Sequence, residues 1–338
     1  MTMPETMNAI AFDAPGGPEV LALRPLPVPF PGPGEVLIRV AAAGVNSPDL
    51  QQRRGRYDPP PGASPLLGLE AAGEIVALGE GSTRFNLGTP VTALCNGGGY
   101  AEYVVVPEGQ ALPLPAGWSV LDAAALPETY FTIQQTLVMR AGLGAGMTVL
   151  IHGAAGGIGG AAIGICRACG AVPIAVVSSA AKADYARRLG ATAIIDRSQQ
   201  DIVAAVKDLT GGRGVDRIVD IVGAEAMAQN LEAAAVEGII VQLATLGGAR
   251  AEINAGLIVS KRLSILGSTL RPQPREVKAA IAASLATSVW PALRDGRIAP
   301  PLIRRFALAD AADAHRAMEE RGHFGKIVLL TPFGASLA

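Results

Sequence analysis

Cysteine is scarce in this sequence: Cys95, Cys166 and Cys169 are the three in a chain of 338 residues. A small, odd number in a chain of this length indicates a reducing compartment rather than a disulfide-linked secreted protein, so we expect a cytoplasmic location. Cys166 and Cys169 form a CxxC pair, but no second pair and no nearby histidine accompanies them. We interpret them as small residues packed on a helix rather than as zinc ligands or a redox pair.

The sequence also lacks an excess of charge of one sign and a long apolar run. The formal net charge is −1 with 17% charged residues, which argues against a nucleic-acid partner or an anionic membrane surface. No stretch of about 18 apolar residues is free of charge and glycine, so a membrane span is not expected. The first residues, MTMPETMNAI, lack a basic segment followed by an apolar one, so we expect no signal peptide.

What is present falls into two textures, and the length favours two domains. Residues 1–122 are rich in Pro and Gly and carry short apolar runs, for example at 34–44, 71–79 and 100–108, which predict an irregular, mostly β domain. From Ala123 strands and helices alternate, which is typical of a doubly wound parallel sheet. Strands are predicted over 171–179, 191–196, 215–223, 238–247 and 261–271, and helices over 183–190, 201–211 and 224–235. Beyond residue 272 we expect two more helices and a last strand at 325–330.

The stretch IHGAAGGIGG, residues 151–160, lies between a predicted strand and a predicted helix. Aligned on Gly156 and Gly159 it has the A-x-G-x-x-G form of a dinucleotide-binding turn. Gly156 would let a phosphate approach the backbone, and Gly159 would let the helix pack closely on the strand. The N–H groups of Gly157 and Ile158 would face the pyrophosphate at the helix N-terminus. An ordinary glycine-rich turn is the alternative, which the further strand–helix repeats make the weaker one.

The end of the next predicted strand favours NADP over NAD. An acidic residue normally binds the ribose hydroxyl there, but Ser178 and Ser179 occupy its place, and Lys182 and Arg197 follow. Hydroxyls and cations suit a 2′-phosphate, which an acid would repel. Asp196 and Asp184 weaken this argument slightly, and the alternative is that the two cations are ordinary surface charges.

Several longer stretches carry a family resemblance. They are NSPDLQQRRGRYDPPPGASPLLGLEAAG (46–73), GGGYAEYVVVPEG (97–109), ALPETYFTIQQTL (125–137) and GKIVLL (325–330), besides the glycine turn. The chain resembles the zinc-free quinone oxidoreductase branch of the medium-chain dehydrogenase/reductase superfamily, with its strongest likeness to the tumour-suppressor-induced member of animals. The resemblance implies an α/β protein: a GroES-like, mostly β catalytic domain over 1–122 with 272–338, and a doubly wound Rossmann domain over 123–271. One departure is Ala155, where the animal relative carries serine.

The resemblance also addresses the metal. Zinc-dependent members of the superfamily have a cysteine and a histidine ligand where this chain has Asn46 and Leu69. The whole chain has three histidines, which are isolated from one another, and the first domain has one cysteine, so we expect no zinc. Hydride transfer to an acceptor that needs no strong Lewis acid remains, such as a quinone or an enone.

The expected chemistry assigns roles to three residues. NADPH would pass a hydride from C4 to a quinone in the interdomain cleft, and the oxygen that gains charge needs a hydrogen-bond donor or a proton. Tyr57 and Asn46 are the candidate donors because they match family positions at the nicotinamide end, and Asp49 is a possible orienting partner. The alternatives are a half-buried turn tyrosine for Tyr57 and hydrogen bonds to loop backbone for Asn46 and Asp49.

The resemblance implies further cofactor contacts, Asn46 included. Thr132 should lie near the nicotinamide ribose or phosphate, and the ends of later strands should face the same nucleotide. The contacts expected from strand ends and from the C-terminal region are Ile221, Leu243, Thr245, Leu246, Ser268, Leu270 and Arg321. We expect His152, just before the glycine turn, to make a structural hydrogen bond rather than to act in catalysis.

Three functions remain open at this stage. The first is NADPH-dependent, zinc-independent quinone reduction, and the second is reduction of an enone or enoyl thioester by the same chemistry. The third is an NADPH-binding redox sensor without turnover. For a thioester the only basic patch near the site is RRGR (53–56). We also expect the last Rossmann strand to lie at a sheet edge and to pair across a two-fold axis in a homodimer.

Overall fold

The chain folds into two compact units, which a computed structural model describes over residues 3–320 and 322–338. The mixed-sheet unit comprises Met1–Phe131, Arg271–Ala286 and Leu302–Ala338. The parallel-sheet unit comprises Thr132–Leu270 and Thr287–Pro301. Within the described ranges, no helix combines the length and the apolarity that a membrane crossing requires.

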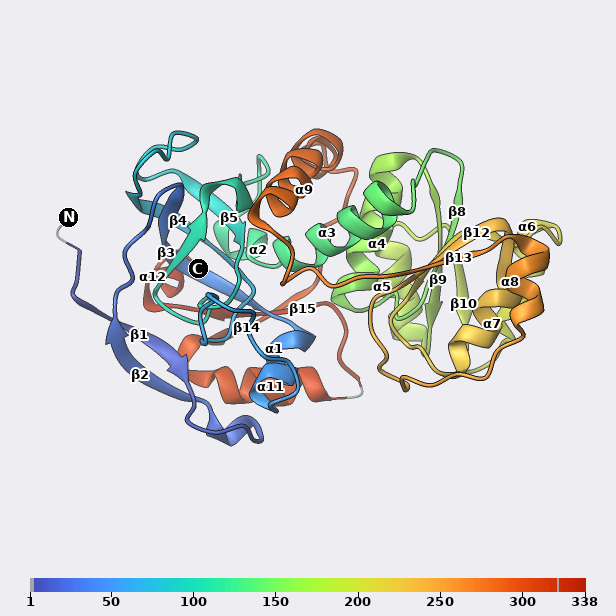
Figure 1. Cartoon of the computed structure of the whole chain (residues 1–338), viewed down its shortest axis with the longest axis horizontal. Helices are drawn as coiled ribbons and strands as arrows, with labels where there is room; N and C mark the ends of the chain where they lie inside the picture. The colour runs from blue at the N-terminus through green and yellow to red at the C-terminus, as the bar shows by residue number, and fades with distance from the viewer. Residues whose placement is uncertain (1–2, 321) are drawn as a thin grey trace. The chain divides into compact units, whose positions relative to one another are not determined.

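The mixed-sheet unit is built around a seven-stranded sheet (Figure 1). Its strand order is β14 (Ile303–Ala307), β15 (Lys326–Leu330), β3 (Glu35–Val45), β4 (Glu70–Leu78), β5 (Pro90–Leu94) and β7 (Ala111–Pro113), with β6 (Tyr103–Pro107) paired to β3. The apolar run 34–44 forms the long central β3, whose side chains are buried almost throughout because neighbouring elements cover both faces. Pairing of β3 with β15 joins segments from the two ends of the sequence.

Short elements complete this unit. They are the hairpin β1 (Thr6–Ala11) and β2 (Ala22–Pro27), and the helices α1 (Ser47–Arg53), α2 (Val120–Ala123), α11 (Ala311–Glu319) and α12 (Pro332–Ala335). Helix α1 begins directly after β3, with Asn46 as its first cap and proline in its first turn, as helix starts prefer. The chain leaves the unit within α3 (Pro127–Ile133) and again within α9 (Arg275–Ser288), and it returns at Arg271 and at Leu302.

The parallel-sheet unit has six strands, all parallel. Their order is β10 (Ala193–Asp196), β9 (Val172–Val177), β8 (Thr148–Ile151), β11 (Val215–Asp220), β12 (Ala234–Gln242) and β13 (Ser264–Gly267). One face carries α4 (Gly157–Cys169) and α5 (Ala180–Leu189), and the other carries α6 (Ile202–Thr210) and α7 (Glu225–Ala233) (Figure 1). The predicted α/β class, a mostly β part and a doubly wound parallel sheet, is confirmed.

Parallel strands place all their carboxyl ends at one edge of the sheet. The strand order reverses between β8 and β11, which is where open α/β sheets bind ligands. Strand β13 lies at the edge of the sheet, as predicted.

Several elements differ from the sequence prediction. The predicted strand 261–271 is only β13, because α8 (Ala255–Lys261) ends where it was expected to begin. Strand β14 lies in the tail, where we expected helices before the last strand. Cys166 and Cys169 lie on α4 as predicted, the first buried and the second half-buried.

Candidate functional site

The glycine turn between β8 and α4 has two kinds of glycine. A Cβ on Gly159 would overlap Ala154 Cα and lie 2.5 Å from the Gly153 carbonyl oxygen, so close packing demands glycine there. A Cβ on Gly156, the residue before α4, would meet only the Gly153 oxygen, at an ordinary 3.4 Å. Packing within the protein therefore does not explain Gly156, whose missing side chain leaves space open at the helix N-terminus.

The N-terminus of α4 is suited to binding an anion. The first N–H groups of α4, at Gly157, Ile158 and Gly159, have no acceptor within the helix, and no side chain caps it. Together with the helix dipole these groups attract an anion. The residues present thus fit the diphosphate of a dinucleotide.

Polar groups follow β9 at the same edge. Ser178 and Ser179 come directly after the strand, and the Ser179 Oγ accepts a hydrogen bond from the Lys182 backbone N–H at the start of α5 (3.4 Å). The Arg197 N–H donates to the Val177 carbonyl oxygen (3.0 Å), which places Arg197, an exposed residue, beside the end of β9. The sequence-predicted group of two serines and two cations is therefore gathered around one strand end.

Asp196, the acid that weakened the NADP argument, is held within its own loop. Its Oδ1 accepts hydrogen bonds from the Ser198 hydroxyl (2.7 Å) and N–H (3.0 Å). These bonds lower the pKa of the Asp196 carboxyl. The carboxylate is thus occupied by a neighbouring residue.

The turn after β11 is held by a buried chain of polar side chains. Asp220 Oδ1 accepts hydrogen bonds from the N–H groups of Val222 (2.6 Å) and Gly223 (3.1 Å). Asn230 Nδ2 donates to Asp220 Oδ2 (2.8 Å), and Asn230 Oδ1 lies 2.7 Å from His152 Nε2. Because the amide oxygen only accepts, His152 Nε2 carries the proton, and burial lowers the pKa of this imidazole. His152 therefore makes the structural hydrogen bond that we expected.

This turn brings four of the expected cofactor contacts together. The Leu243 N–H donates to the Asp220 oxygen (2.8 Å) and the Leu246 N–H to the Ile221 oxygen (3.1 Å), which also brings Thr245 to this edge. A Cβ on Gly153 would lie 2.6 Å from Ile221 Cδ1, so this side chain packs on the glycine turn.

The remaining candidates of the parallel-sheet unit lie near its last strand. Ser268 follows β13 and its hydroxyl donates to Gln135 Oε1 (3.2 Å), one turn beyond Thr132. Leu270 is half-buried close by in sequence. The Thr132 carbonyl oxygen accepts a hydrogen bond from the Thr136 hydroxyl (2.7 Å). Arg321 lies outside the described residues.

In the mixed-sheet unit Asp49 holds backbone. Its Oδ2 accepts the Asn46 N–H (2.8 Å) and its Oδ1 accepts the Gly68 N–H (2.9 Å). Burial raises the pKa of the Asp49 carboxyl to about 6, although the two N–H donors oppose the shift. Asp49 thus fixes the start of α1 and, through it, the position of Asn46.

The Asn46 side chain lies in a buried cluster that sequence reasoning missed. Lys326 Nζ lies 2.6 Å from both Asn46 Oδ1 and Glu70 Oε1, and Asn46 Nδ2 donates to the same Glu70 oxygen (2.8 Å). A Cβ on Gly44 would overlap the Glu70 carboxylate, so glycine in β3 makes room for it. The available signal was a charged residue at the first position of each of two apolar strands, β4 and β15.

Glu128 adjoins this cluster at the start of α3. Its N–H donates to Glu70 Oε2 (2.9 Å), which completes the hydrogen bonds of the Glu70 carboxylate. Burial raises the pKa of the Glu128 side chain to about 7, the nearby Lys326 opposes the shift, and Glu70 adds to it. This carboxyl is thus poised to change protonation near neutral pH.

Tyr57 follows α1 and is half-buried beneath a cation. The Arg271 guanidinium carbon lies 5.6 Å from the centre of the phenol ring, and Arg271 is fixed by bonds to the Asn96 oxygen and Gln52 Oε1 (2.7 Å). Burial raises the pKa of Tyr57 while the positive charge of Arg271 opposes this. Among the described residues, none receives or donates a hydrogen bond at the Tyr57 hydroxyl, so it is available to a ligand.

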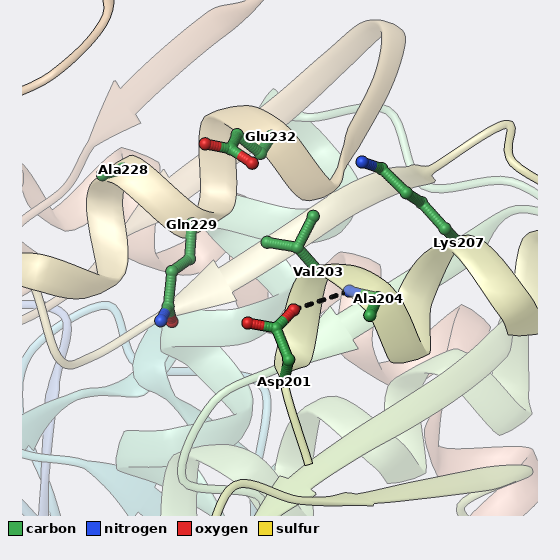
Figure 2. Close-up of a pocket in the computed structure, with 7 residues that line it drawn as sticks. All are labelled: Asp201, Val203, Ala204, Lys207, Ala228, Gln229 and Glu232. Carbon is green, nitrogen blue, oxygen red and sulfur yellow. Dashed lines mark hydrogen bonds between the residues drawn. The ribbon is translucent and has the colours of Figure 1, made fainter.

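A hollow elsewhere in the parallel-sheet unit holds none of these residues. It lies between α6 and α7 and is lined by Asp201, Val203, Ala204, Lys207, Ala228, Gln229 and Glu232 (Figure 2). Asp201 uses one carboxylate oxygen to accept the Ala204 N–H (2.8 Å) and so caps α6. In the ranges that the structure describes, no group of three or more His, Cys, Asp or Glu side chains could hold a metal ion.

Comparisons with known proteins agree with this geometry. The alcohol dehydrogenase GroES-like domain family matches residues 32–116, and the zinc-binding dehydrogenase family matches residues 157–286. A quinone oxidoreductase of Pseudomonas aeruginosa is 36% identical over 95% of this chain and 98% of its own length.

Three solved structures extend the comparison. A quinone oxidoreductase of Pseudomonas syringae has a TM-score of 0.83 at 31% identity, over 96% of this chain and 99% of its own. A mycobacterial protein complexed with NADPH has a TM-score of 0.83 at 29% identity, over 96% of this chain and 99% of its own. The CurK enoyl reductase has a TM-score of 0.83 at 26% identity, over 97% of this chain and 100% of its own. The chain therefore belongs to the quinone oxidoreductase branch of the medium-chain dehydrogenase/reductases, pyridine-nucleotide-dependent enzymes built from a GroES-like and a Rossmann domain.

Proposed function

We propose that this protein reduces quinones with NADPH and without zinc. The observation that carries the proposal is the open N-terminus of α4 at Gly156, in a chain that matches a quinone oxidoreductase along nearly its whole length. The α4 N–H groups would bind the pyrophosphate, and NADPH, when bound, supplies a hydride from C4 of its nicotinamide.

The residues around the end of β9 support NADPH rather than NADH. Ser178 and Ser179 would donate hydrogen bonds to the 2′-phosphate, and Lys182 and Arg197 would supply the opposite charge. Asp196, the acid beside Arg197, stays ionised, and two hydrogen bonds from Ser198 hold one of its carboxylate oxygens within its own loop. Thr132, Ile221, Leu243, Thr245, Leu246, Ser268 and Leu270 would line the rest of the nucleotide.

Zinc independence is supported by what surrounds Asn46. A metal ligand at this position would need an anionic or imidazole donor, whereas Asn46 offers an amide whose oxygen already faces the Lys326 ammonium. A second cation beside Lys326 would be repelled, and the carboxylate that contacts the Asn46 amide, Glu70, is already paired with Lys326.

Tyr57 and Asn46 are the groups that would serve the acceptor. A quinone that accepts a hydride gains negative charge on an oxygen, and a donor placed at that oxygen lowers the barrier. The hydroxyl of Tyr57 has no partner among the described residues, and burial raises its pKa against the opposing charge of Arg271, so the phenol stays protonated and can donate a hydrogen bond to that oxygen.

Reduction of an enoyl thioester is the second candidate, supported by the likeness to the CurK enoyl reductase. The basic patch that such a substrate needs is weakened in the structure. Arg53 is buried and pairs with Glu319 (2.6 Å), and Arg54 pairs with the same carboxylate (2.9 Å). Two of the arginines in RRGR are thus committed, which leaves a quinone as the better-supported acceptor.

We also propose that the protein acts in the cytoplasm as a homodimer. All three cysteines are free, which fits a reducing compartment. Strand β13 has an unpaired edge, and apolar side chains on and near it are exposed, with Val259 79% and Ile265 41% accessible. Pairing of β13 with its copy would cover them. A monomer in sedimentation at micromolar concentration would contradict the dimer.

The first test is the loss of NADPH absorbance with 1,4-benzoquinone, 1,2-naphthoquinone, an alkyl enone and crotonyl-coenzyme A, with NADH in parallel. We expect quinone turnover, and turnover with NADPH well ahead of NADH. Turnover of the enone or thioester alone would assign the alkene-reductase function. NADPH binding without turnover of any acceptor would assign the sensor function.

A further inference from the structure

The buried lysine of the mixed-sheet unit needs an explanation beyond stability. Lys326 and Glu70 form an ion pair (2.6 Å) in which the lysine is 5% exposed and the glutamate is fully buried. Taking two charges out of water costs several kcal/mol per ion, and apolar replacements of such pairs are often as stable. The pair therefore points to a role that an apolar pair could not fill.

The hydrogen bonds define that role. The ammonium only donates, so it fixes Asn46 Oδ1 on its side (2.6 Å), and the Glu70 carboxylate only accepts, so it fixes Asn46 Nδ2 on the other (2.8 Å). An amide held in this way cannot flip and exchange the positions of its oxygen and nitrogen. Of its two Nδ2 hydrogens one is taken by Glu70, and no described residue accepts the other.

The charge on Lys326 also acts through the amide. A cation at the carbonyl oxygen draws electron density from the amide nitrogen and strengthens the N–H as a donor, as in polarised chains of hydrogen bonds. The arrangement is rigid because Gly44 leaves room for Glu70, and because Asp49 holds the Asn46 backbone (2.8 Å).

We propose that Lys326 is a positioning residue for the reduction: with Glu70 it locks and polarises the Asn46 amide so that the free Nδ2 hydrogen is presented to the acceptor oxygen or the nicotinamide. This inference rests on the proposed function of Asn46. In this proposal the positive charge near Asn46 comes from the Lys326 ammonium, a side chain of the protein itself.

The test is a double-mutant cycle of Lys326→Met and Asn46→Ala, measured as kcat and KM for the quinone. Loss of one preorganised donor costs about 100-fold in kcat, so we expect about 10- to 100-fold losses for each single variant. The double variant should be no slower than Asn46→Ala, and Lys326→Arg should recover part of the rate. Losses that multiply in the double variant, or full activity of Lys326→Met, would overturn the proposal. If Lys326→Met fails to fold, the same cycle in a Glu70→Gln background leaves no orphaned carboxylate.

Two controls separate this inference from the proposed function. Lys261→Met removes a lysine that holds three backbone carbonyls of the other unit, and should leave kcat unchanged. NMR of ¹⁵N-asparagine-labelled protein needs no turnover: Lys326→Met should shift the side-chain amide signals of Asn46 and leave those of Asn230 in place. Unmoved Asn46 signals would overturn the inference even in an active enzyme, whereas shifted signals in a protein without turnover would uphold the positioning and reject the quinone reductase.

Discussion

Each unit of the protein buries an asparagine between a basic side chain and a carboxylate, with different results. In the mixed-sheet unit Asn46 bridges Lys326 and Glu70, which also contact each other directly. In the parallel-sheet unit Asn230 bridges His152 and Asp220. The amide has the same orientation in both, with its oxygen toward the base and its nitrogen toward the acid.

The difference lies in where the charges and the free hydrogens go. Burial lowers the pKa of His152 and keeps it neutral. The oxygens of Asp220 accept hydrogen bonds from Asn230 and from the backbone of the turn after β11. Around Asn46 the base is a full cation, the carboxylate neutralises it, and one amide hydrogen has no acceptor among the described residues. The same residue type thus holds a turn in the parallel-sheet unit and, in our proposal, serves the reduction in the mixed-sheet unit, where it lies beside an ion pair.

The largest expected effect is on stability, from Asn230→Leu. It leaves the His152 N–H and one Asp220 oxygen buried without partners, which costs about 2–6 kcal/mol at about 1–3 kcal/mol for each group. Urea denaturation should show this loss, and Gln229→Leu, at the exposed neighbouring position, should not. If Asn230→Leu lowered the free energy of unfolding by less than about 1 kcal/mol, Asn230 would not have the structural role that distinguishes it from Asn46.

Asn46→Ala should have the opposite result, with a large effect on activity and a smaller one on stability. We expect kcat for the quinone to fall about 100-fold, or about 2.7 kcal/mol, while stability changes less because Lys326 and Glu70 still pair. Asn86→Ala, an exposed asparagine of the same unit, is the control for steady-state kinetics. An Asn46→Ala enzyme with normal kcat but low stability would show that both asparagines are structural.

The two regions should also respond oppositely to pH. The pKa of Glu128 is raised to about 7, so its contribution to stability is complete below about pH 4.5 and is lost as pH rises through 7. The pKa of His152 is lowered, so its contribution is present above about pH 6.5 and is lost as pH falls.

Unfolding measured from pH 5 to 8 tests this opposition. Relative to the native protein, Glu128→Gln should gain stability toward pH 8, on the order of 2 kcal/mol, and His152→Gln should gain it toward pH 5. Glu276→Gln, at an exposed position, should run parallel to the native curve. If the free energy of unfolding of all three variants followed the native pH dependence, the two regions would not respond oppositely to pH.

The smallest effects concern cofactor choice at the edge that Asn230 supports. Lys182→Ala and Arg197→Ala should each lower the NADPH-over-NADH ratio of kcat/KM about tenfold, the value of one charge-assisted contact. Arg187→Ala, which breaks an exposed ion pair on the same helix, is the control. An unchanged ratio in both variants would make the two cations ordinary surface charges.

The parts of the fold that were predicted correctly are those with strong local patterns. The run before the glycine turn became β8, and the small-residue stretch after it became α4, because apolar periodicity and glycine placement agree there. Strand β14 was missed because its sequence, IRRFA, carries two arginines and pairs with only one neighbour. Strand β13 was drawn too long because α8 takes up the residues before it.

The candidate site divides in the same way. The grouping of the proposed nucleotide contacts at one edge of the sheet could be predicted, because parallel strands all end at the same edge whatever the loops between them do. Lys326 could not be predicted because its partners lie 256 and 280 residues away, and only the pairing of β15 with β3 brings them together. The contact of Arg271 with Tyr57 could not be predicted either, because these residues also lie far apart in the sequence.

The distance between Asn46 and Lys326 along the chain has a consequence for synthesis. A ribosome releases Asn46 and Glu70 long before Lys326, and the parallel-sheet unit is made in between. Domains usually fold in the order in which they emerge, but here the first segment to emerge carries a carboxylate whose counter-ion has not yet been translated. The parallel-sheet unit can thus be complete while the mixed-sheet unit still lacks β15, so the hydrogen bonds around Asn46 form only after Lys326 has been translated.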